Sequence, residues 1–382
     1  MSEPPTPPRG AEPAPRTYLP AIQGLRGLAA LSVLLVHLYL MPLSVGLWSG
    51  RFPDGLLGVL GTGGRGVELF FVISGYLIPA SLRRHGSVGR FFYERALRIL
   101  PLFVILHLVV FAVGPWIGYK FLAGIGPLAY AQAFLANLTF VAPLVDMPLA
   151  QQNAWSLTYE WLFYAWTALA ALAWGGDRSR HLAMAILVAG AVLVAWHFPA
   201  ASYFGLGLAF SRLGSPRGGG RVAGLALGLA SLAAMYGLCE YVSVFAGLPF
   251  AAILFALVLD PGSGFAGLLR GRVLQYLGRV SYSLYLVHPF VLFGLLAVGT
   301  RLGLAARPLW AAAPLVFGVG ARASALAAGI TYELVERRLR GWLERLCAVR
   351  PAAAGRPAPP PHPREAEAWS PVFRKEHPLP KT

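Results

Sequence analysis

Charged side chains are scarce in this chain. Asp, Glu, Lys and Arg make up 13% of its 382 residues, whereas hydrophobic residues make up 57%. A soluble protein of this length would carry about twice that charged fraction. Several apolar runs approach the ~20 residues that a helix needs to cross the hydrocarbon core of a bilayer. The scarcity of charge therefore excludes an ordinary soluble domain and predicts a multi-pass protein embedded in a lipid bilayer.

Cysteine and acidic residues are scarce as well. The chain has two cysteines, Cys239 and Cys347, which excludes a disulfide framework and a cysteine-rich metal site, so we expect no metal. The 32 basic residues exceed the 16 acidic ones and give a net charge of +16. Almost all are arginines placed between apolar runs, with no basic surface interleaved with aromatic residues. Since basic loops between apolar spans are what membrane orientation predicts, we expect no nucleic-acid partner.

The two ends of the chain differ in composition from the middle. Residues 1–17 are Pro-rich, and residues 347–382 are Pro- and Ala-rich and then polar, so both are predicted to be disordered cytoplasmic tails. The first apolar run does not follow the basic segment that begins a signal peptide, so we expect it to remain as a helix. Residues 18–346 are predicted to form one membrane domain.

Ten membrane-spanning helices and one shorter segment are expected within that domain. The run from Pro127 to Leu144 allows two interpretations. As a span it would place Arg178, Arg180 and every later basic loop outside, whereas as a re-entrant or interfacial segment it keeps the basic loops cytoplasmic, and we adopt the second. The prediction is an all-α transmembrane helix bundle with both termini cytoplasmic. Residues 50–66 are expected to form a Gly-rich loop, and the expected spans are residues 22–43, 67–82, 99–117, 155–174, 182–197, 201–213, 222–240, 244–259, 276–299 and 309–334.

One early stretch, QGLRGLAALSVLLVH, carries two ionisable residues on the first expected span. At ~1.5 Å per residue, Arg26 and His37 lie roughly 16 Å apart along the helix axis, and eleven steps of ~100° bring them to nearly the same face. Arg26 would then lie near one surface and His37 deep in the membrane, where an ionisable group is costly and usually functional. A neutral imidazole there can act as a general base toward a hydroxyl. A hydrogen bond to a neighbouring helix explains it equally well.

Arginines cluster between the second and third expected spans. Arg95 and Arg98, in RFFYERALRILP, are spaced i, i+3 and share a helix face at the inner surface. Guanidiniums in this arrangement suit bidentate binding of phosphate, and Arg83 and Arg84 belong to the same basic stretch. On spacing alone, anchoring to lipid headgroups is the simpler interpretation.

Two carboxylates lie near helix starts. Glu160, in WSLTYEWLFY, follows an expected outer loop and lies about one turn inside its helix, where it can orient a histidine or bind a sugar hydroxyl. Glu68, in GVELFF, allows the same interpretation. For both residues, a favourable interaction with the helix dipole is the alternative.

A fourth group lies in SYSLYLVHPF. Tyr282 and Tyr285 share a helix face that His288 continues, so the three side chains can line a polar cavity. Interfacial tyrosines, with a polar residue before the helix-perturbing Pro289, are the favoured explanation from the residues alone.

Seven stretches together resemble the acyltransferase 3 family of integral membrane proteins, which acylate carbohydrates and other acceptors. They occur in the family order and cover roughly residues 18–340: IQGLRGLAALSVLLVH, GVELFFVISGYLI, FFYERALRILP, WSLTYEWLFY, YFGLGLAF, LGRVSYSLYLVHPF and YELVERRLR. Each stretch alone is a weak signal, but seven in order are specific.

The resemblance implies a ten-helix inner-membrane protein that takes its acyl group from cytoplasmic acyl-CoA, commonly acetyl-CoA. The family patterns Arg-x10-His, Arg-x-x-Arg and WSL-x-x-Glu fall on Arg26 with His37, Arg95 with Arg98, and Ser156 with Glu160. The chain departs from the family at Gln23, where many members have an acidic residue, and at Glu68, where Asp is common. Arg322, inside the last apolar run, has no place in the family pattern.

We therefore hypothesise an O-acyltransferase of the bacterial inner membrane that moves an acyl group, most simply acetyl, to a hydroxyl of a carbohydrate or glycolipid acceptor. His37 would act as general base, or carry the acyl group itself, in a catalytic set with Arg26 and Glu160. The residues expected to bind the phosphates of CoA are Arg95, Arg98, Arg83 and Arg84. Those expected to line the substrate site are Glu68, Ser156, Tyr282 and His288. The alternative is a transporter or flippase for a lipid-linked sugar, which buried Arg, His and Glu would serve equally well.

Overall fold

The computed structural model describes five parts of the chain: residues 19–48, 54–174, 180–213, 218 and 220–346. Within these parts the chain forms helices and connecting turns and no strand, which confirms the predicted all-α fold. The predicted tails and Arg178 lie outside the described residues.

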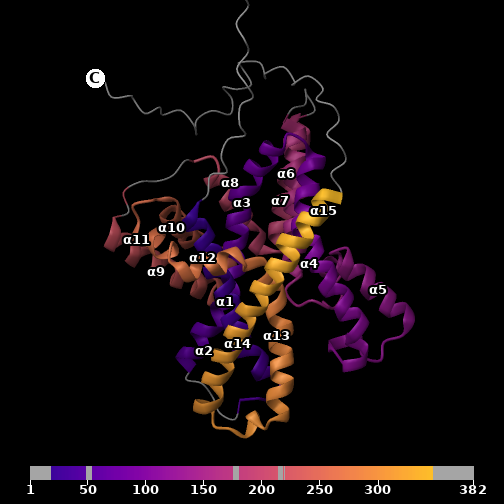
Figure 1. Ribbon diagram of the computed structural model, residues 1–382. Coiled ribbons are helices and arrows are strands. Elements are labelled where there is room, and N and C mark those ends of the chain that lie inside the picture. The colour runs from indigo at the N-terminus through magenta and orange to yellow at the C-terminus, as the bar shows by residue number, and fades with distance from the viewer. Residues whose placement is uncertain (1–18, 49–53, 175–179, 214–217, 219, 347–382) are drawn as a thin grey trace, which may run out of the picture.

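The described chain contains α-helices of very different lengths, a π-helix and short 3-10 turns (Figure 1). The longest helices form the body of the molecule, and the short ones connect or brace them. In chain order the helices are α1 (Pro20–Ser44), α2 (Asp54–Gly61), α3 (Gly66–His85), α4 (Val88–Ile117), α5 (Pro127–Leu138), α6 (Trp155–Trp174), α7 (Arg180–His197), α8 (Ser202–Phe210), α9 (Arg221–Tyr241), α10 (Leu248–Leu259), α11 (Gly264–Leu269), α12 (Arg272–Arg279), α13 (Ser281–Arg301), α14 (Leu309–Thr331), the π-helix (Tyr332–Leu339) and α15 (Arg340–Leu346).

Seven helical segments of the described chain are long and apolar enough to cross a membrane, so the chain is a multi-pass membrane protein. These segments are Pro20–Ser44, Gly58–His85, Val88–Ile117, Arg180–His197, Arg221–Tyr241, Ser281–Arg301 and Leu309–Leu346. The count of ten spans and the cytoplasmic placement of both termini stay predictions.

Three helices are shorter than the spans or segments that the sequence predicts at their positions. Helix α5 has 12 residues and rises about 18 Å, less than the ~30 Å hydrocarbon core, which favours the re-entrant or interfacial interpretation. Helix α8 has 9 residues and α10 has 12, so neither alone reaches across. Apolar runs in the middle of the chain therefore do not correspond one to one with helices of membrane-spanning length.

The structure corrects three of the expected boundaries. Residues 54–65, expected within a Gly-rich loop, are helical, because α2 and a 3-10 turn (Thr62–Arg65) precede α3. The run 276–299 is broken at Val280 into α12 and α13. Helix α4 begins at Val88, well before the expected residue 99, because the side chain of Ser87 accepts a hydrogen bond from the backbone N–H of Arg90 at 3.2 Å and caps the helix.

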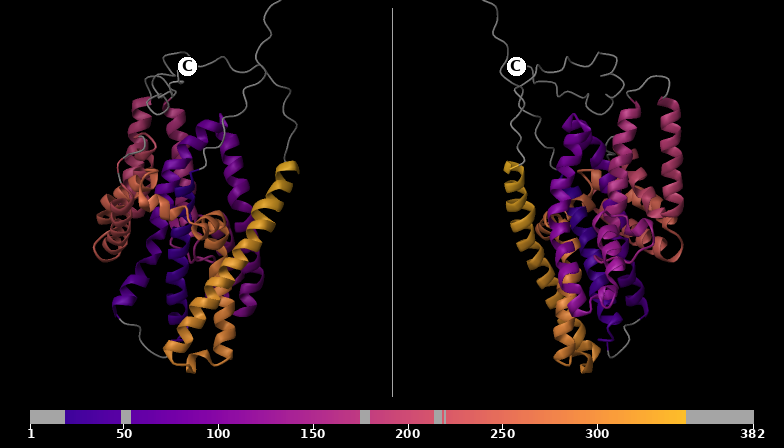
Figure 2. Two further views of the ribbon diagram at one scale, coloured as in Figure 1. Left: turned by 60° about the vertical axis from the view of Figure 1, so that its left-hand side comes forward. Right: turned by 90° about the vertical axis from the view of Figure 1, so that its right-hand side faces the viewer.

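The turns at the two ends of the bundle define two faces. Helices α13 and α14 form an antiparallel hairpin whose turn lies at the bottom of Figures 1 and 2, whereas the turn between α3 and α4 lies near the top. Helix α14 continues through the π-helix into α15 as one long inclined helix along the side of the molecule (Figure 2). Helix α1 packs against α3, α12 and α13, so it forms the centre of the bundle.

Glycines allow the closest helix crossings. A Cβ atom at Gly75 of α3 would lie 2.1 Å from the backbone oxygen of Phe204, and one at Gly207 of α8 would lie 2.0 Å from that of Val72. Small residues at such crossings let helix backbones approach directly, as is common between membrane helices. The short α8 is held against α3 by this backbone contact.

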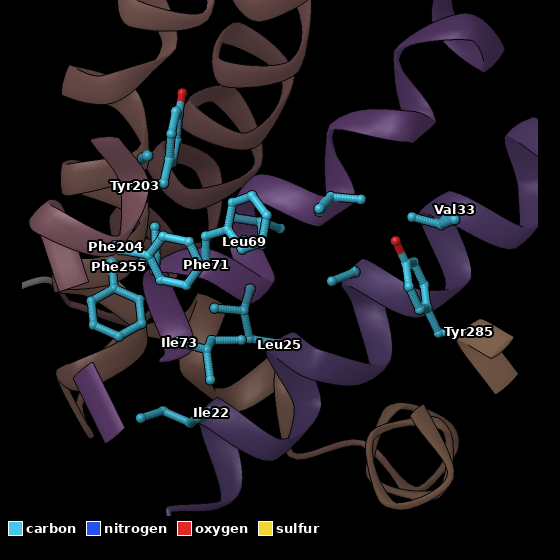
Figure 3. Packing of buried hydrophobic residues seen from close by; sticks show 14 of the residues in the cluster. Ile22, Leu25, Val33, Leu69, Phe71, Ile73, Tyr203, Phe204, Phe255 and Tyr285 are labelled. Atoms are coloured by element: carbon cyan, nitrogen blue, oxygen red, sulfur yellow. The ribbon is translucent and has the colours of Figure 1, made fainter. Parts of the chain in front are cut away.

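Aromatic side chains fill the space beside this crossing. Phe71 of α3 stacks on Phe204 of α8 with ring centroids 4.3 Å apart, and Phe163 of α6 stacks on Phe204 at 4.5 Å (Figure 3 shows Phe71 and Phe204). Leu25 of α1 is fully buried in the same core cluster. Helices α1, α3, α6 and α8 thus share one packed core that fixes the positions of the polar residues described below.

We expect the substitution Gly207→Ala to destabilise the protein, because the new Cβ would force α8 away from α3. Overpacking of this kind costs about 1–3 kcal/mol. Gly205→Ala on the same helix is the matched control, since a Cβ there meets no atom within 4 Å. Thermal unfolding in detergent, followed by size-exclusion chromatography, measures both. Equal midpoints for the two variants would contradict the packing account.

Candidate functional site

A cavity of about 100 Å³ lies among α1, α3, α4, α6 and α13. We call it the arginine cavity, because three guanidinium-bearing side chains line it. Six of the residues selected from the sequence lie on its wall: Arg26, Arg95, Arg98, Ser156, Glu160 and Tyr282. The fold therefore brings together residues that are up to 256 positions apart in the chain.

The three arginines come from two helices. Arg26 lies in the second turn of α1, and Arg95 and Arg98 lie one turn apart on α4. The early start of α4 matters here, because it puts both arginines on a continuous helix rather than in a loop. Their i, i+3 spacing then directs both side chains to the same cavity, as the sequence predicted.

None of these three guanidiniums has a carboxylate partner within the described chain. Arg26, Arg95 and Arg98 form no salt bridge with a described residue. Arg95 donates a long hydrogen bond of 3.4 Å to the Ser81 hydroxyl, and its Nε is buried with no partner. Unused donors on buried guanidiniums are suited to a bound anion, above all to a planar or tetrahedral oxyanion that accepts two hydrogen bonds from one guanidinium.

Glu160 is the carboxylate of this wall. Its Oε1 accepts a hydrogen bond from the hydroxyl of Tyr164, one turn further along α6, and a second at 3.4 Å from Ser74 of α3. Arg26 lies on the wall of the same cavity. Hydroxyl groups, rather than a direct ion pair, therefore hold this carboxylate in place.

His37 lies outside the arginine cavity, in a pair with His288. The Nδ1 of His37 lies 3.2 Å from the Nε2 of His288, with ring centroids 5.0 Å apart. Each Nδ1 also lies 2.7 Å from a backbone oxygen one turn earlier on its own helix, that of Val33 for His37 and that of Leu284 for His288.

These contacts assign the tautomers of the two neutral imidazoles. A backbone oxygen only accepts, so both Nδ1 atoms carry the proton and both Nε2 atoms carry a lone pair. The Nδ1–H of His37 is then shared between two acceptors, the backbone oxygen of Val33 and the Nε2 of His288. The Nε2 of His37 accepts a hydrogen bond of 3.3 Å from the side-chain amide of Gln152. His37 thus presents an unprotonated nitrogen, as a general base requires.

Side chains of α6 and α13 connect the histidine pair to the arginine cavity. Tyr285 lies on the cavity wall, and His288 follows it by one turn of α13. The hydroxyl groups of Tyr285 and Ser156 lie 2.9 Å apart, and Asn153 donates to the backbone oxygen of Tyr285 at 2.6 Å. The cavity therefore ends, on the side of His288, at a hydrogen-bonded pair of hydroxyls.

A second, larger pocket of about 500 Å³ adjoins the histidine pair from the other side. We call it the outer pocket. It lies at the end of α13 that carries Arg301, whereas the arginine cavity lies at the other end of this helix. Polar side chains on its wall come from Ser44, Lys120, Gln152 and Thr300. Since Gln152 both lines this pocket and contacts His37, the outer pocket reaches the unprotonated nitrogen through one side chain.

Besides His37, four of the selected residues lie outside the arginine cavity. Glu68 does not line the arginine cavity: it forms a salt bridge of 3.2 Å with Arg65, which also pairs with Glu240 at 2.8 Å. Arg83 and Arg84 are exposed at the end of α3 and do not line the cavity. His288 lies in the histidine pair.

The structure brings three further residues to the site that carry no recognisable signal in the sequence: Tyr164, Gln152 and Glu336. Gln152 contacts His37, and Glu336 contacts Ser283, across long distances in the sequence. Tyr164 contacts Glu160 on the same helix through a side-chain geometry that no local pattern reveals. Arg322 lies exposed on α14, and its Nη1 donates to the backbone oxygen of Gly318 on the same helix at 3.3 Å. Among the described residues, no cluster of three His, Cys, Asp or Glu suited to a metal occurs.

The fold and site define a class: a multi-pass helical membrane protein with a buried, arginine-rich cavity next to a histidine pair. Residues 19–329 match the acyltransferase 3 family, whose model is described as an acyltransferase domain. The chain therefore belongs to this family and is an acyltransferase, which confirms the assignment that its motifs predicted.

Curated relatives agree with this assignment. The exopolysaccharide production protein ExoZ of Rhizobium meliloti is 30% identical over 328 residues, which cover 78% of this chain and 95% of ExoZ. Acyltransferase MdmB of Streptomyces mycarofaciens is 28% identical over 363 residues, covering 83% and 90%. Peptidoglycan O-acetyltransferase OatA of Listeria monocytogenes is 26% identical over 323 residues, covering 72% of this chain but 49% of OatA. No solved structure matches the chain.

We expect Tyr164→Phe to lower acyl transfer about tenfold, because Glu160 loses its donor on α6 and is no longer held at the cavity wall. Tyr130→Phe is the matched control: it also removes one hydroxyl, which donates to the backbone oxygen of Phe111 at 2.6 Å outside the cavity. The amount of acyl group transferred, at matched protein levels, measures both. An equal loss in the two variants would show that Tyr164 only stabilises the fold.

Proposed function

We propose that this acyltransferase moves an acyl group, most simply acetyl, from acyl-CoA to a hydroxyl of a carbohydrate acceptor. The observation that carries the proposal is the arginine cavity, where Arg26 and Arg98 have no carboxylate partner among the described residues. Three guanidiniums in one small cavity favour an anionic substrate. The phosphates of CoA are such anions.

The proposed orientation places the arginine cavity toward the cytoplasm of a bacterial inner membrane. Arg83, Arg84 and Arg90 lie near the turn between α3 and α4, at the same end of α4 as Arg95. Basic residues favour the cytoplasmic side of short loops. Acyl-CoA, a cytoplasmic metabolite, would then approach the face on which these arginines lie. The exposed Arg83 and Arg84 would attract its phosphates before Arg95 and Arg98 bind them.

The proposed reaction takes place at His37. The Nε2 of His37 takes the proton of the acceptor hydroxyl while that oxygen attacks the thioester carbonyl. The carbon–sulfur bond breaks, the acyl ester forms, and the thiolate of CoA takes the proton back from the imidazolium. His288 accepts a hydrogen bond from the Nδ1–H of His37 and so stabilises the imidazolium while it exists. In the alternative that the sequence leaves open, His37 carries the acyl group itself.

The outer pocket is the proposed site of the acceptor. Its volume of about 500 Å³ suits one or two sugar rings, and its wall combines polar groups with Tyr119 and Phe293. A sugar hydroxyl that displaces the amide of Gln152 would reach the Nε2 of His37. The names of ExoZ, an exopolysaccharide production protein, and OatA, a peptidoglycan O-acetyltransferase, support a carbohydrate acceptor, and that of OatA supports an acetyl group.

The donor half of the proposal is tested by CoA binding. We expect the double variant Arg95→Ala/Arg98→Ala to bind CoA at least tenfold more weakly than the wild type, because each charged hydrogen bond contributes about 1.5–3 kcal/mol. Arg337→Ala/Arg338→Ala is the control, since these two exposed arginines pair with Glu333. Isothermal titration of the purified protein gives both dissociation constants. Unchanged CoA binding by the first variant would remove the phosphate-binding role.

The reaction itself is tested by mass spectrometry of the surface carbohydrate in a deletion strain. We expect the loss of one acetyl increment per repeating unit while the carbohydrate is still exported. Loss of the exported carbohydrate itself, with acetylation of the remainder intact, would instead indicate a transporter.

A further inference from the structure

A second carboxylate, Glu336, lies beside the arginine cavity and was not among the residues selected from the sequence. It lies on the π-helix that continues α14. Its Oε1 accepts two hydrogen bonds from one residue of α13, Ser283: one from the backbone N–H at 3.1 Å and one from the hydroxyl. The preceding residues, Ser281 and Tyr282, lie on the wall of the cavity. Glu336 thus binds the first turn of the helix that leads from the cavity to His288.

Hydrogen bonds place Glu336 close to Arg98. Tyr282, the neighbour of the Ser283 that Glu336 binds, donates its hydroxyl to the backbone oxygen of Ile99 at 2.6 Å, and Ile99 directly follows Arg98. Within the described chain Glu336 forms no salt bridge with Arg98 or Arg26. With Glu160 on the wall, two carboxylates therefore oppose three guanidiniums, and one net positive charge is left at the cavity. Such a cavity attracts an anion and yet is partly neutralised when it is empty.

The two carboxylates of the π-helix have different partners. π-Helical turns are rare and are frequent at functional sites. Glu333, three residues before Glu336, instead pairs with Arg337 at 2.7 Å and Arg338 at 3.3 Å on the exposed side. Beyond the π-helix, Arg340 pairs with Glu94 of α4 at 3.0 Å, which fixes the end of the segment on the helix that carries Arg95.

We propose that Glu336 is the counter-charge of the arginine cavity, which neutralises Arg26 and Arg98 when the cavity is empty and weakens their hold on CoA after transfer. This inference rests on the proposed function, because it takes CoA as the anion. Glu336 acts through the arginines and does not touch the reacting atoms. It therefore sets how readily the spent donor leaves rather than the chemistry of transfer.

The substitution Glu336→Gln separates charge from structure. The amide oxygen of Gln still accepts both hydrogen bonds of Ser283, so α13 keeps its position, but the negative charge is gone. Removal of one negative charge beside the cavity is expected to tighten CoA binding about fivefold. Glu333→Gln is the matched control, with the same substitution on the same π-helix and the same change in net charge. Ser283→Ala, which removes one hydrogen bond but no charge, tests the structural contribution.

The experiment measures binding of two probes, CoA and inorganic pyrophosphate, to the purified full-length protein in detergent. We expect Glu336→Gln to bind CoA about fivefold more tightly than the wild type, Glu333→Gln and Ser283→Ala. We also expect pyrophosphate to raise its thermal unfolding midpoint more than theirs. In turnover, KM for the acyl donor should fall and kcat should not rise. Glu336→Asn, a second neutral variant, should show the same changes.

Three results would overturn the inference: CoA affinity of Glu336→Gln no higher than that of Glu333→Gln, an equal response of both to pyrophosphate, or equal tightening by Ser283→Ala. If the proposed function is wrong and CoA is not the ligand, the measurements give a different set of results. In that case no variant binds CoA, while pyrophosphate still stabilises Glu336→Gln more than Glu333→Gln, and the counter-charge role stands for another anion.

Discussion

The burial of three guanidiniums beside one small cavity is the constraint on which the rest of the structure depends. A charge inside a membrane protein is costly unless it is paired or serves a substrate. Here neither Arg26 nor Arg98 has a carboxylate at salt-bridge distance among the described residues. Glu160 and Glu336 approach the arginines but are held by hydroxyl and backbone donors instead. The cavity is thus kept nearly neutral and still able to accept an anion.

Helix α13 connects this cavity to the histidine pair. Tyr282 and Tyr285 face the cavity, His288 lies one turn further on, and Pro289 already lines the outer pocket. Helix α1 makes the same connection with Arg26 and His37. Two helices therefore pass from a cationic cavity, past a pair of imidazoles, to a pocket at the other face. This order of groups matches a transfer in which an anionic donor and a neutral acceptor meet from opposite sides.

Local patterns predicted the parts of the site that lie within single helices. Helical periodicity placed Arg95 and Arg98 on one face, and the family patterns indicated His37 and Glu160. Arg83 and Arg84 lie in the last turn of α3, exposed and off the cavity wall, although they are close in sequence to Arg95. The partners of Glu68 could not be predicted either, since Glu240, which shares Arg65 with it, is 172 residues away.

The boundaries of helices show the same limit. Hydropathy predicted α1 within two residues at its start, because a long apolar run has few alternatives. It did not reveal the break at Val280 or the π-helix, because both lie in stretches whose composition is typical of a continuous helix. Glu336 lies in the π-helix and contacts Ser283, which is 53 residues away in the sequence. Such contacts depend on tertiary packing, which no local pattern encodes.

The central claim is that transfer takes place at His37, and one measurement tests it most directly. Purified wild type and His37→Gln, in detergent at equal concentrations so that both faces are accessible, are supplied with radiolabelled acetyl-CoA and the native surface carbohydrate. The account predicts equal CoA affinity for the two proteins and a rate of acetyl transfer at least about 100-fold lower for His37→Gln, the range expected for loss of a general base. Transfer by His37→Gln at a rate near that of the wild type would contradict it.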